Sequence, residues 1–212
     1  NITGNDFPFK KVRSAVYSDT LHPAKWENLK FDKNFGHMNV LLLGSTGEYS
    51  SKILIKFIPK GDFKSIKSAT MILNPHSSIG EETEKFEGVI YEITSEWNEN
   101  EIPNVSYNPD ELVSFSVPYT TDKPDTVEIP PEVVEKWYND EKGNYGVMIE
   151  YRNANFIKKY YSSETTSYPC IIVTGETEKG EEKIKMYPEL DTYIITSTIE
   201  PVENELLVDD LS

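Results

Sequence analysis

The chain has a single cysteine, Cys170, among its 212 residues, so no disulfide can form within it. Cys170 lies in the apolar run CIIVT at 170–174, and we expect it to be a small buried core residue. A lack of disulfides is usual in a reducing compartment, but it does not exclude a cell surface.

Basic residues and long apolar runs are also scarce. The chain has 21 Lys and Arg against 36 Asp and Glu, a formal net charge of −15. A field of that sign repels phosphate backbones, so we expect no nucleic-acid partner. No apolar run approaches the length of a membrane span, so we expect no membrane insertion.

Motifs that carry chemistry are missing as well. The three histidines lie in expected loops, without the Cys or paired-His spacing of a zinc site, at His22, His37 and His76. There is no glycine-rich phosphate loop and no G-x-S-x-G elbow. We therefore expect no metal centre and no cofactor, with calcium on an acidic loop as the alternative left open.

Acidic pairs occur, but nothing in the sequence sets the distance between their carboxylates. These pairs are Glu81-Glu82, Glu99-Glu101 and Asp140-Glu141. We expect a protein that is not an enzyme, and a polysaccharide-degrading activity is the weakest of the functions considered.

Short strand-like runs separated by Gly, Pro and Asn make up most of the chain. In residues 52–58, Ile53, Ile55 and Phe57 alternate with Lys52, Leu54 and Lys56, the period of a half-buried strand. Residues 77–84 are acidic and are expected to be a flexible loop. Strands are predicted at 14–17, 39–44, 52–58, 68–73, 86–93, 112–117, 127–129, 147–151, 155–161, 170–174 and 190–197.

One short helix is predicted after Pro130. Pro131 and Glu132 suit a first helical turn, where amide donors are free and the dipole favours negative charge. Val133, Val134, Trp137 and Tyr138 follow at helical spacing, and Gly143 ends the segment. Many short strands with one helix predict an all-β fold, a jelly-roll β-sandwich with extended terminal segments.

Composition divides the chain into four parts. Residues 1–13 are predicted to be an extended leader, and residues 14–175 the jelly-roll β-sandwich. The highly charged residues 176–188 are predicted to be a linker or a hairpin. Residues 189–212 are a strand-like C-terminal segment, read as the start of a further repeat or as a donated strand.

Four blocks of the sequence, in order, resemble one known family. They are the ILIKF and IKSATMIL runs within 52–73, the ITSEWNEN run within 93–109, the V-V-x-x-W and NYG elements within 127–146, and the F, SSE and YP elements within 156–173. Together these blocks resemble the DNRLRE (disaggregatase-related) domain. The resemblance covers about residues 14–175 and implies a jelly-roll sandwich of the kind found among alginate-type carbohydrate-binding modules.

The same resemblance assigns structural roles to several residues. Trp97 and Trp137 lie in blocks that look structural, so we expect both to be buried. Tyr160, Tyr161 and Glu164 are expected to fix the closing strands rather than to act on a substrate.

Sugar binding needs aromatic rings for stacking and planar polar groups for hydrogen bonds. The carbohydrate-binding candidates outside the expected core are Trp26, Tyr119, Tyr138, Tyr151 and Arg152, for which packing in the core or its rim is the alternative. The net charge of −15 opposes an anionic polysaccharide such as alginate.

The C-terminal segment resembles the way such domains begin, with a D-x-Y-I strand and an L-x-V strand. The segment is predicted either to pair with a neighbouring subunit by strand addition or to pack on its own or a following domain. The partner-strand candidates are Asp191, Tyr193, Ile195, Leu206 and Val208.

These observations favour a non-catalytic extracellular module. We expect a structural and adhesive subunit of a filament or another cell-surface or virion appendage, whose partners are neighbouring copies or domains of the same assembly. The alternative is a carbohydrate-binding module that recognises a polysaccharide.

Overall fold

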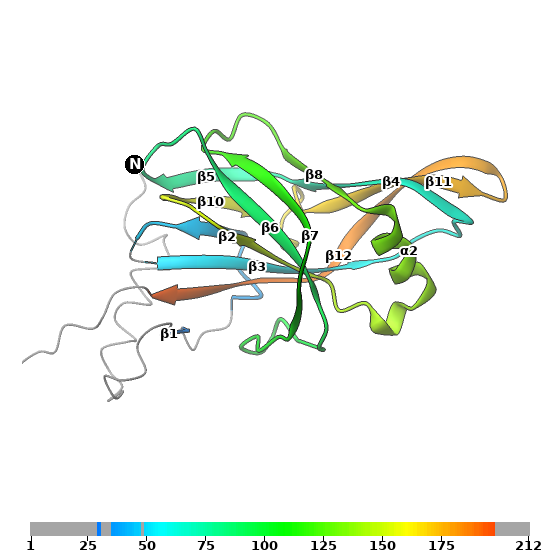
Figure 1. Ribbon diagram of the computed structural model, residues 1–212, viewed down its shortest axis with the longest axis horizontal. Helices are drawn as coiled ribbons and strands as arrows, with labels where there is room; N and C mark the ends of the chain where they lie inside the picture. The colour runs from blue at the N-terminus through cyan, green and yellow to red at the C-terminus, as the bar shows by residue number, and fades with distance from the viewer. Residues whose placement is uncertain (1–28, 31–34, 48, 198–212) are drawn as a thin grey trace, which may run out of the picture.

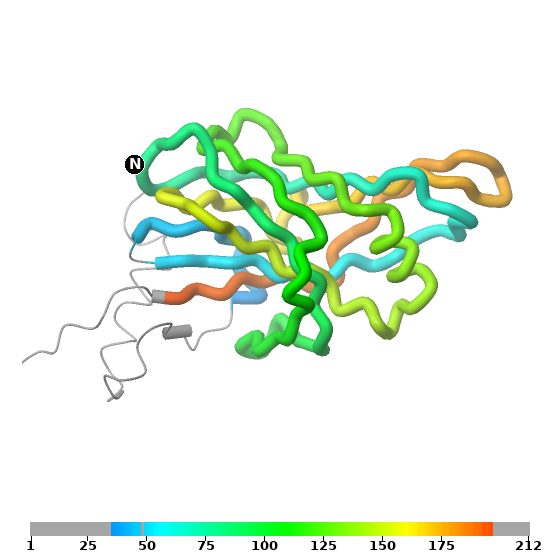
Figure 2. Tube along the Cα trace, in the orientation of Figure 1, coloured from blue at the N-terminus to red at the C-terminus, as the bar shows by residue number. Residues whose placement is uncertain are grey.

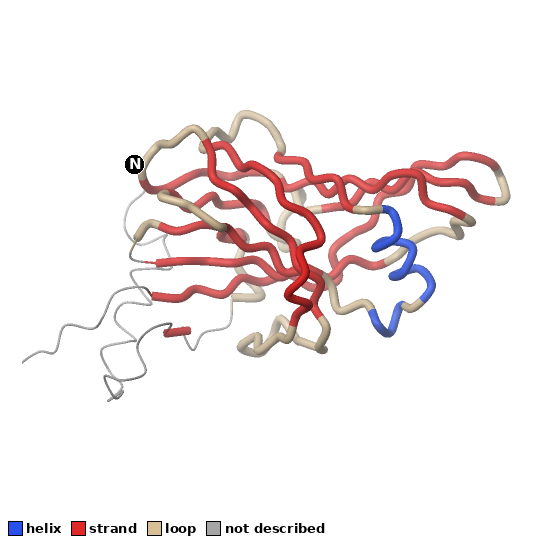
Figure 3. The backbone as a smooth tube through the Cα atoms, viewed as in Figure 1, coloured by secondary structure: helices blue, strands red, loops and turns tan. Residues whose placement is uncertain are grey.

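The computed structural model describes residues 29–30, 35–47 and 49–197 of the chain. This part is all-β, with one short α-helix at one end of the strands (Figures 1 and 3). The strands are β1 (Leu29–Lys30), β2 (Val40–Ser45), β3 (Tyr49–Ile58), β4 (Ser65–Leu73), β5 (Pro75–Gly80), β6 (Lys85–Ile93), β7 (Tyr107–Pro118), β8 (Asp125–Ile129), β9 (Val147–Tyr151), β10 (Phe156–Tyr161), β11 (Cys170–Thr177) and β12 (Gly180–Ser197). Helix α2 (Pro131–Asn139) and the 3-10 turn η2 (Glu141–Gly143) connect β8 to β9.

Strand β3 is the centre of the sheet. The main path runs β5-β10-β2-β3-β12-β11-β4-β8, and every pairing is antiparallel. One edge of β3 pairs with β12 along its whole length. The other edge pairs with β2 at Ser50 and Ser51, and with β9 from Ile53 to Ile55. The sheet therefore divides at β3 into two wings, β2-β10-β5 and β9-β6-β7.

The two wings pack face to face, which makes the fold a sandwich. In Figure 1, β6 and β7 cross over the wing that contains β2 and β10. The ring of Phe86 on β6 lies 4.6 Å from that of Phe156 on β10, and Tyr119 lies 5.2 Å from Phe156. The predicted all-β sandwich with one short helix is confirmed.

Strand β12 is part of this sandwich. Its first residues, 180–186, form a hairpin with β11, and residues 187–197 pair with β3. In Figure 2 the orange-to-red trace of β12 lies beside the cyan trace of β3. Of the two forms predicted for 176–188 the hairpin is therefore the one observed, and residues 189–197 pack on their own domain.

The core extends over both faces of β3. Ile53, Ile55 and Phe57 point into the main core, as their alternation predicts. Leu54 lies on the opposite face in a second cluster with Trp97 and Met148. Both Trp97 and Trp137 are buried, as predicted, and so is Cys170.

Helix α2 is where Pro131 and Glu132 predict a helix start. It buries Val134 and Trp137 in the main core and lies against β4, where Glu135 accepts a hydrogen bond from the Ile66 amide at 2.9 Å. No helix within the described ranges has the length and hydropathy needed to cross a bilayer.

One secondary-structure prediction is wrong. Part of the acidic stretch 77–84 forms β5, which pairs with β10 through Ile79 opposite Ile157. The pairing uses backbone hydrogen bonds that follow the bend at Asn74, where the Tyr161 amide donates to the Asn74 carbonyl at 2.9 Å. The apolar pattern of the segment could not reveal this because only Ile79 contributes to it. The predicted leader and strand within 1–17, and residues 198–212, lie outside the described residues.

Candidate functional site

The carbohydrate-binding candidates do not form one site. Tyr119 and Tyr151 pack against the main core, with the Tyr151 ring 6.4 Å from that of Phe86. Tyr138 and Arg152 each line a surface hollow. Trp26 lies outside the described residues.

The first hollow lies on the outer face of β3, β9 and β12 and has a volume of about 290 Å³. Its charged groups are already paired: Lys52 binds Glu150, and Arg152 binds Glu87 at 2.7 Å and Glu111 as well. The hydrogen bond that Arg152 donates to Glu111 raises the pKa of Arg152. The hollow is lined by Ser50, Ser51, Lys52, Glu150, Tyr151, Arg152, Ile194 and Thr196.

The second hollow lies at the other end of the strands, between α2 and the β11–β12 hairpin, and has a volume of about 650 Å³. Phe63 and Tyr138 meet there edge to face, with their ring centroids 5.5 Å apart. The Tyr138 hydroxyl accepts from the Lys60 amide at 3.2 Å and donates to the Lys60 carbonyl, and burial raises its pKa. Asp62, Asn139 and Glu182 add planar polar groups, so the hollow joins rings to hydrogen-bonding side chains.

Sequence reasoning found Tyr138 but not Phe63. The spacing of α2 marks Tyr138 as a residue at the rim of the core. Phe63 lies in a loop, where no period distinguishes an exposed ring from a buried one.

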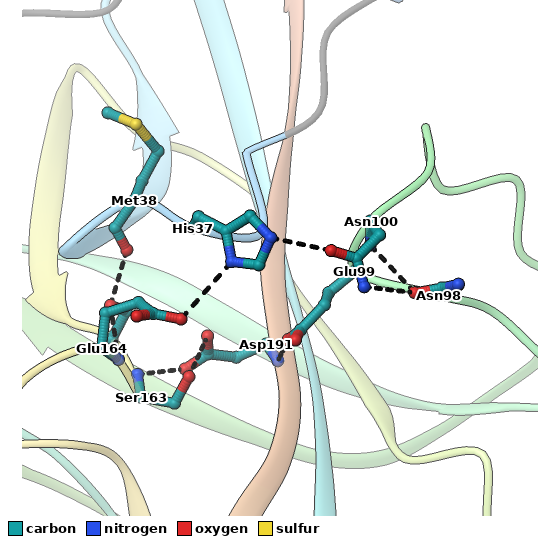
Figure 4. Close-up of polar contacts among 9 residues, drawn as sticks. His37, Met38, Asn98, Glu99, Asn100, Ser163, Glu164 and Asp191 are labelled. Carbon is teal, nitrogen blue, oxygen red and sulfur yellow. Dashed lines mark hydrogen bonds and ion pairs between the residues drawn. The ribbon is translucent and has the colours of Figure 1, made fainter.

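A third polar site surrounds Asp191, which is 1% exposed (Figure 4). Its carboxylate accepts hydrogen bonds from the amide of Ser163 at 2.6 Å and from its hydroxyl at 2.9 Å. Its own amide donates to Glu99 at 3.4 Å. Burial above all, with the charges of Glu99 and Glu164, raises the pKa of Asp191 to about 6, although the two hydrogen bonds from Ser163 lower it.

His37 closes the same site at the surface. Its Nε2 lies 2.7 Å from the side-chain oxygen of Asn100, and its Nδ1 lies 3.6 Å from Glu164. These contacts, that with Asn100 first, raise the pKa of His37. The site therefore connects three loops to β12: the one before β2, the one at 94–106 and the one between β10 and β11.

The fourth site is inside the sandwich. Lys158 on β10 is fully buried, and its Nζ lies 2.7 Å from the carboxylate of Asp125 at the start of β8. It also donates to the Pro118 carbonyl at 2.9 Å. The hydroxyl of Tyr160 donates to the same Asp125 oxygen at 2.7 Å. Burial, followed by the Asp125 charge, raises the pKa of Tyr160.

The sequence did not reveal this fourth site. Lys158 stands next to Lys159 in a strand with mixed polarity, and Asp125 stands in a turn rich in charged residues. Nothing in either pattern separates a buried ion from a solvated one.

The partner-strand candidates are placed in part. Asp191, Tyr193 and Ile195 lie in β12 and pair with β3 of the same chain. The Tyr193 ring stacks on Phe35 at 4.5 Å, so these side chains serve the core of their own domain. Leu206 and Val208 lie outside the described residues.

Metal ligands do not gather in the part of the chain that the structure describes. It contains no group of three or more His, Cys, Asp or Glu side chains placed to hold an ion. The calcium alternative stays a prediction.

Comparison with known protein families gives no match, and comparison with curated proteins gives none either. The relation to the DNRLRE domain therefore remains the prediction that the four sequence blocks support.

Proposed function

We propose that the chain is a non-catalytic extracellular β-sandwich module, a structural and adhesive subunit of a cell-surface or virion appendage whose neighbours are joined by strand addition. The observation that carries the proposal is the free edge of β7. Within the described ranges β7 is the longest strand that pairs on one side alone, with β6.

The composition of β7 supports this role. Natural edge strands are usually protected by charges, proline or bulges, because their free amides and carbonyls template pairing with another chain. Asp110 and Glu111 protect the beginning of β7, and Pro118 ends it. A register shift at Leu112 also lies near the beginning of β7, but residues 113–117, VSFSV, carry neither charge nor proline and pair regularly with β6. This stretch is therefore open to a strand from a neighbour.

The use of the buried polar groups agrees with a structural role. The Asp191 carboxylate holds the backbone of Ser163, and Lys158 holds Asp125 and the Pro118 carbonyl. A general acid or base must exchange a proton with a substrate. These groups instead complete contacts between strands and loops.

Strand addition is tested at β7 itself. Ser114 and Ser116 are exposed, so the double variant Ser114→Lys, Ser116→Lys places charge on the edge without removing core atoms. The matched control is Ser68→Lys on β4, whose neighbours β8 and β11 already pair with it. Light scattering over a range of protein concentrations measures association.

We expect the wild type and Ser68→Lys to associate and the β7 variant to stay monomeric. Equal association of the two variants contradicts the role of β7, and a monomeric wild type contradicts strand addition between copies. Removing residues 198–212, which leaves β12 complete, tests whether that segment supplies the strand.

The second hollow favours an alternative, a carbohydrate-binding module. Phe63 and Tyr138 offer rings for stacking, and Asp62 and Asn139 offer hydrogen bonds. A glycan array with the wild type, Phe63→Ala and Arg152→Ala tests it. Binding that Phe63→Ala abolishes supports a sugar site at this hollow, and loss only in Arg152→Ala moves the site to the first hollow. No binding by the wild type contradicts the alternative.

A further inference from the structure

Lys158 and Asp125 form an ion pair that is buried inside the sandwich. The ammonium nitrogen and the carboxylate oxygen Oδ2 are 2.7 Å apart, and the two side chains are 0% and 6% exposed. The pair connects strands that are not neighbours, since β10 pairs with β2 and β5 while β8 pairs with β4. The pair therefore joins the wing β2-β10-β5 to β8, which is at the other end of the main strand path.

Two further contacts orient the pair. The Pro118 carbonyl accepts from Lys158 Nζ at 2.9 Å, which fixes the direction of the lysine. The Tyr160 hydroxyl donates to Asp125 Oδ2 at 2.7 Å, the same oxygen that faces the lysine. The Tyr160 ring also lies beneath the nitrogen, 5.8 Å from ring centroid to Nζ.

Burial changes what such a pair can do. An ion pair away from water carries a large desolvation penalty, which is removed when the proton moves from the amine to the acid. The neutral amine then has a free lone pair beside a carboxylic acid. Two groups fixed in reacting geometry behave as if at very high concentration, because their translational entropy is already lost.

We propose that Lys158 and Asp125 condense to an intramolecular amide, an isopeptide cross-link between β10 and β8. Lys158 Nζ attacks Asp125 Cγ and forms the N–C bond, and the Cγ–Oδ2 bond breaks. Two of the three ammonium protons leave with Oδ2 as one water molecule, and the third stays on the amide nitrogen. No oxidant or other reactant enters the balance.

Tyr160 is a positioning residue with a defined part in this step. Its hydroxyl donates a hydrogen bond to the oxygen that departs, and so stabilises the charge that develops there. Its raised pKa keeps the phenol protonated, as a donor must be. The phenol ends the reaction unchanged.

The cross-link goes beyond the proposed function, since it does not depend on any partner or ligand. It would give a covalent connection across a sandwich that has no disulfide, in which Cys170 is the only cysteine. A chain with such a bond cannot separate β8 from β10 by unfolding alone.

Mass spectrometry of the purified full chain tests the proposal. We expect an intact mass below that of the sequence by one water molecule. After proteolysis we expect a branched peptide that joins the segments of Asp125 and Lys158, with no tryptic cleavage after Lys158. An unchanged intact mass overturns the proposal, and so does a water loss confined to one peptide, as in a cyclised aspartate.

The chain supplies its own control. Lys67 lies 2.5 Å from Glu176 in an ion pair whose side chains are 49% and 41% exposed. We expect no cross-link there, because water solvates both charges. A cross-link at Lys67 but not at Lys158 would contradict the proposal that burial promotes the reaction.

Variants identify the reacting groups. Lys158→Met and Asp125→Ala are each expected to keep the full sequence mass. Tyr160→Phe keeps the ring and is expected to slow the loss of water, followed by intact mass at successive times after synthesis. Unchanged kinetics in a folded Tyr160→Phe variant overturns the role of the phenol. If that variant does not fold, the wild-type mass still decides the cross-link.

Discussion

Asp191 holds both the amide and the hydroxyl of Ser163, at 2.6 Å and 2.9 Å, from a strand at the centre of the sheet. The carboxylate thereby satisfies a backbone donor of the β10–β11 loop, which has no strand to pair with. Because Asp191 is 1% exposed, its carboxylate is shielded from bulk water, and these two hydrogen bonds stabilise its charged form. The relationship makes stability sensitive to pH.

We expect the chain to be more stable at pH 5 than at pH 7.5. The pKa of Asp191 is about 6 in the folded chain against an ordinary 3.8, so the folded state binds this proton more tightly than the unfolded state. The stabilisation is present below pH 4 and is lost as the pH rises through 6. The rise in pKa from 3.8 to about 6 corresponds to about 3 kcal/mol at most, and about half of this is still present at pH 5. Urea unfolding at pH 5, 6 and 7.5 measures it.

His37 changes stability in the same direction. Because the pKa of His37 is raised in the folded chain, protonation of His37 stabilises the fold below about pH 6.5. This stabilisation is lost as the pH rises through the pKa of the folded state. Asp191→Asn should flatten most of the pH dependence, while Asp110→Asn on the exposed beginning of β7 should leave it intact. Equal pH profiles for the two variants would show that Asp191 is not the source.

Gly146→Ala should destabilise the chain far more than Gly180→Ala. Both glycines have positive φ, +89° and +107°. A Cβ on Gly146 would lie 2.3 Å from the Ile55 carbonyl of β3, whereas a Cβ on Gly180 meets nothing within 4 Å. We expect about 1 kcal/mol for Gly180→Ala from the left-handed backbone alone, and about 3 kcal/mol or more for Gly146→Ala. Thermal unfolding of both variants measures the difference, and equal losses would contradict a close approach of β9 to β3.

Trp97→Ala should cost about 3–5 kcal/mol, the range for a large aromatic side chain removed from a core. Trp97 covers the second cluster, and its indole donates to the Tyr145 carbonyl at 2.7 Å. Trp97→Phe keeps an aromatic ring, although a smaller one, and loses the hydrogen bond, whose loss is expected to cost about 1–2 kcal/mol. Ile102 lies in the same connection between β6 and β7, but it is exposed. Ile102→Ala should therefore change stability by less than about 0.5 kcal/mol. Comparable losses at Trp97 and Ile102 would show that residues 94–106 do not cover a core.

Arg152→Ala should change stability by less than about 1 kcal/mol. Its ion pairs with Glu87 and Glu111 are exposed, and exposed pairs contribute little because water screens them. Urea unfolding measures this, and a loss of several kcal/mol would contradict it. A small effect makes Arg152→Ala a suitable folded variant for binding experiments.

Most strands could be predicted from the sequence, and the reason is visible in β3 and β9. Ile53, Ile55 and Phe57 occupy every second position of β3 because one face of this strand packs on the main core. The sequence of β3 therefore shows a period of two. The residues Val147–Tyr151 were predicted with the observed bounds. Strand β5 was missed because its place depends on pairing with β10 rather than on apolar side chains.

The sites were harder to predict than the strands. Tyr138 could be singled out from helical spacing, but its partner Phe63 is 75 positions away and lies in a loop. Asp191 was selected for a neighbour's sheet, yet it connects β12 to Ser163 of its own chain. Residues at this sequence separation come together only when β12 pairs with β3.

The sequence by itself determined the fold class, the helix and the burial of Cys170, because each depends on local periodicity and on the transfer of apolar groups from water. The burial of Trp97 and Trp137 was expected from the resemblance to the DNRLRE domain. The tertiary structure alone decided that β12 lies at the centre of the sheet and that Lys158 meets Asp125. These outcomes depend on long-range backbone pairing, which brings together residues that no sequence period connects. The Lys158–Asp125 pair and the edge of β7 are therefore the places where experiment should begin.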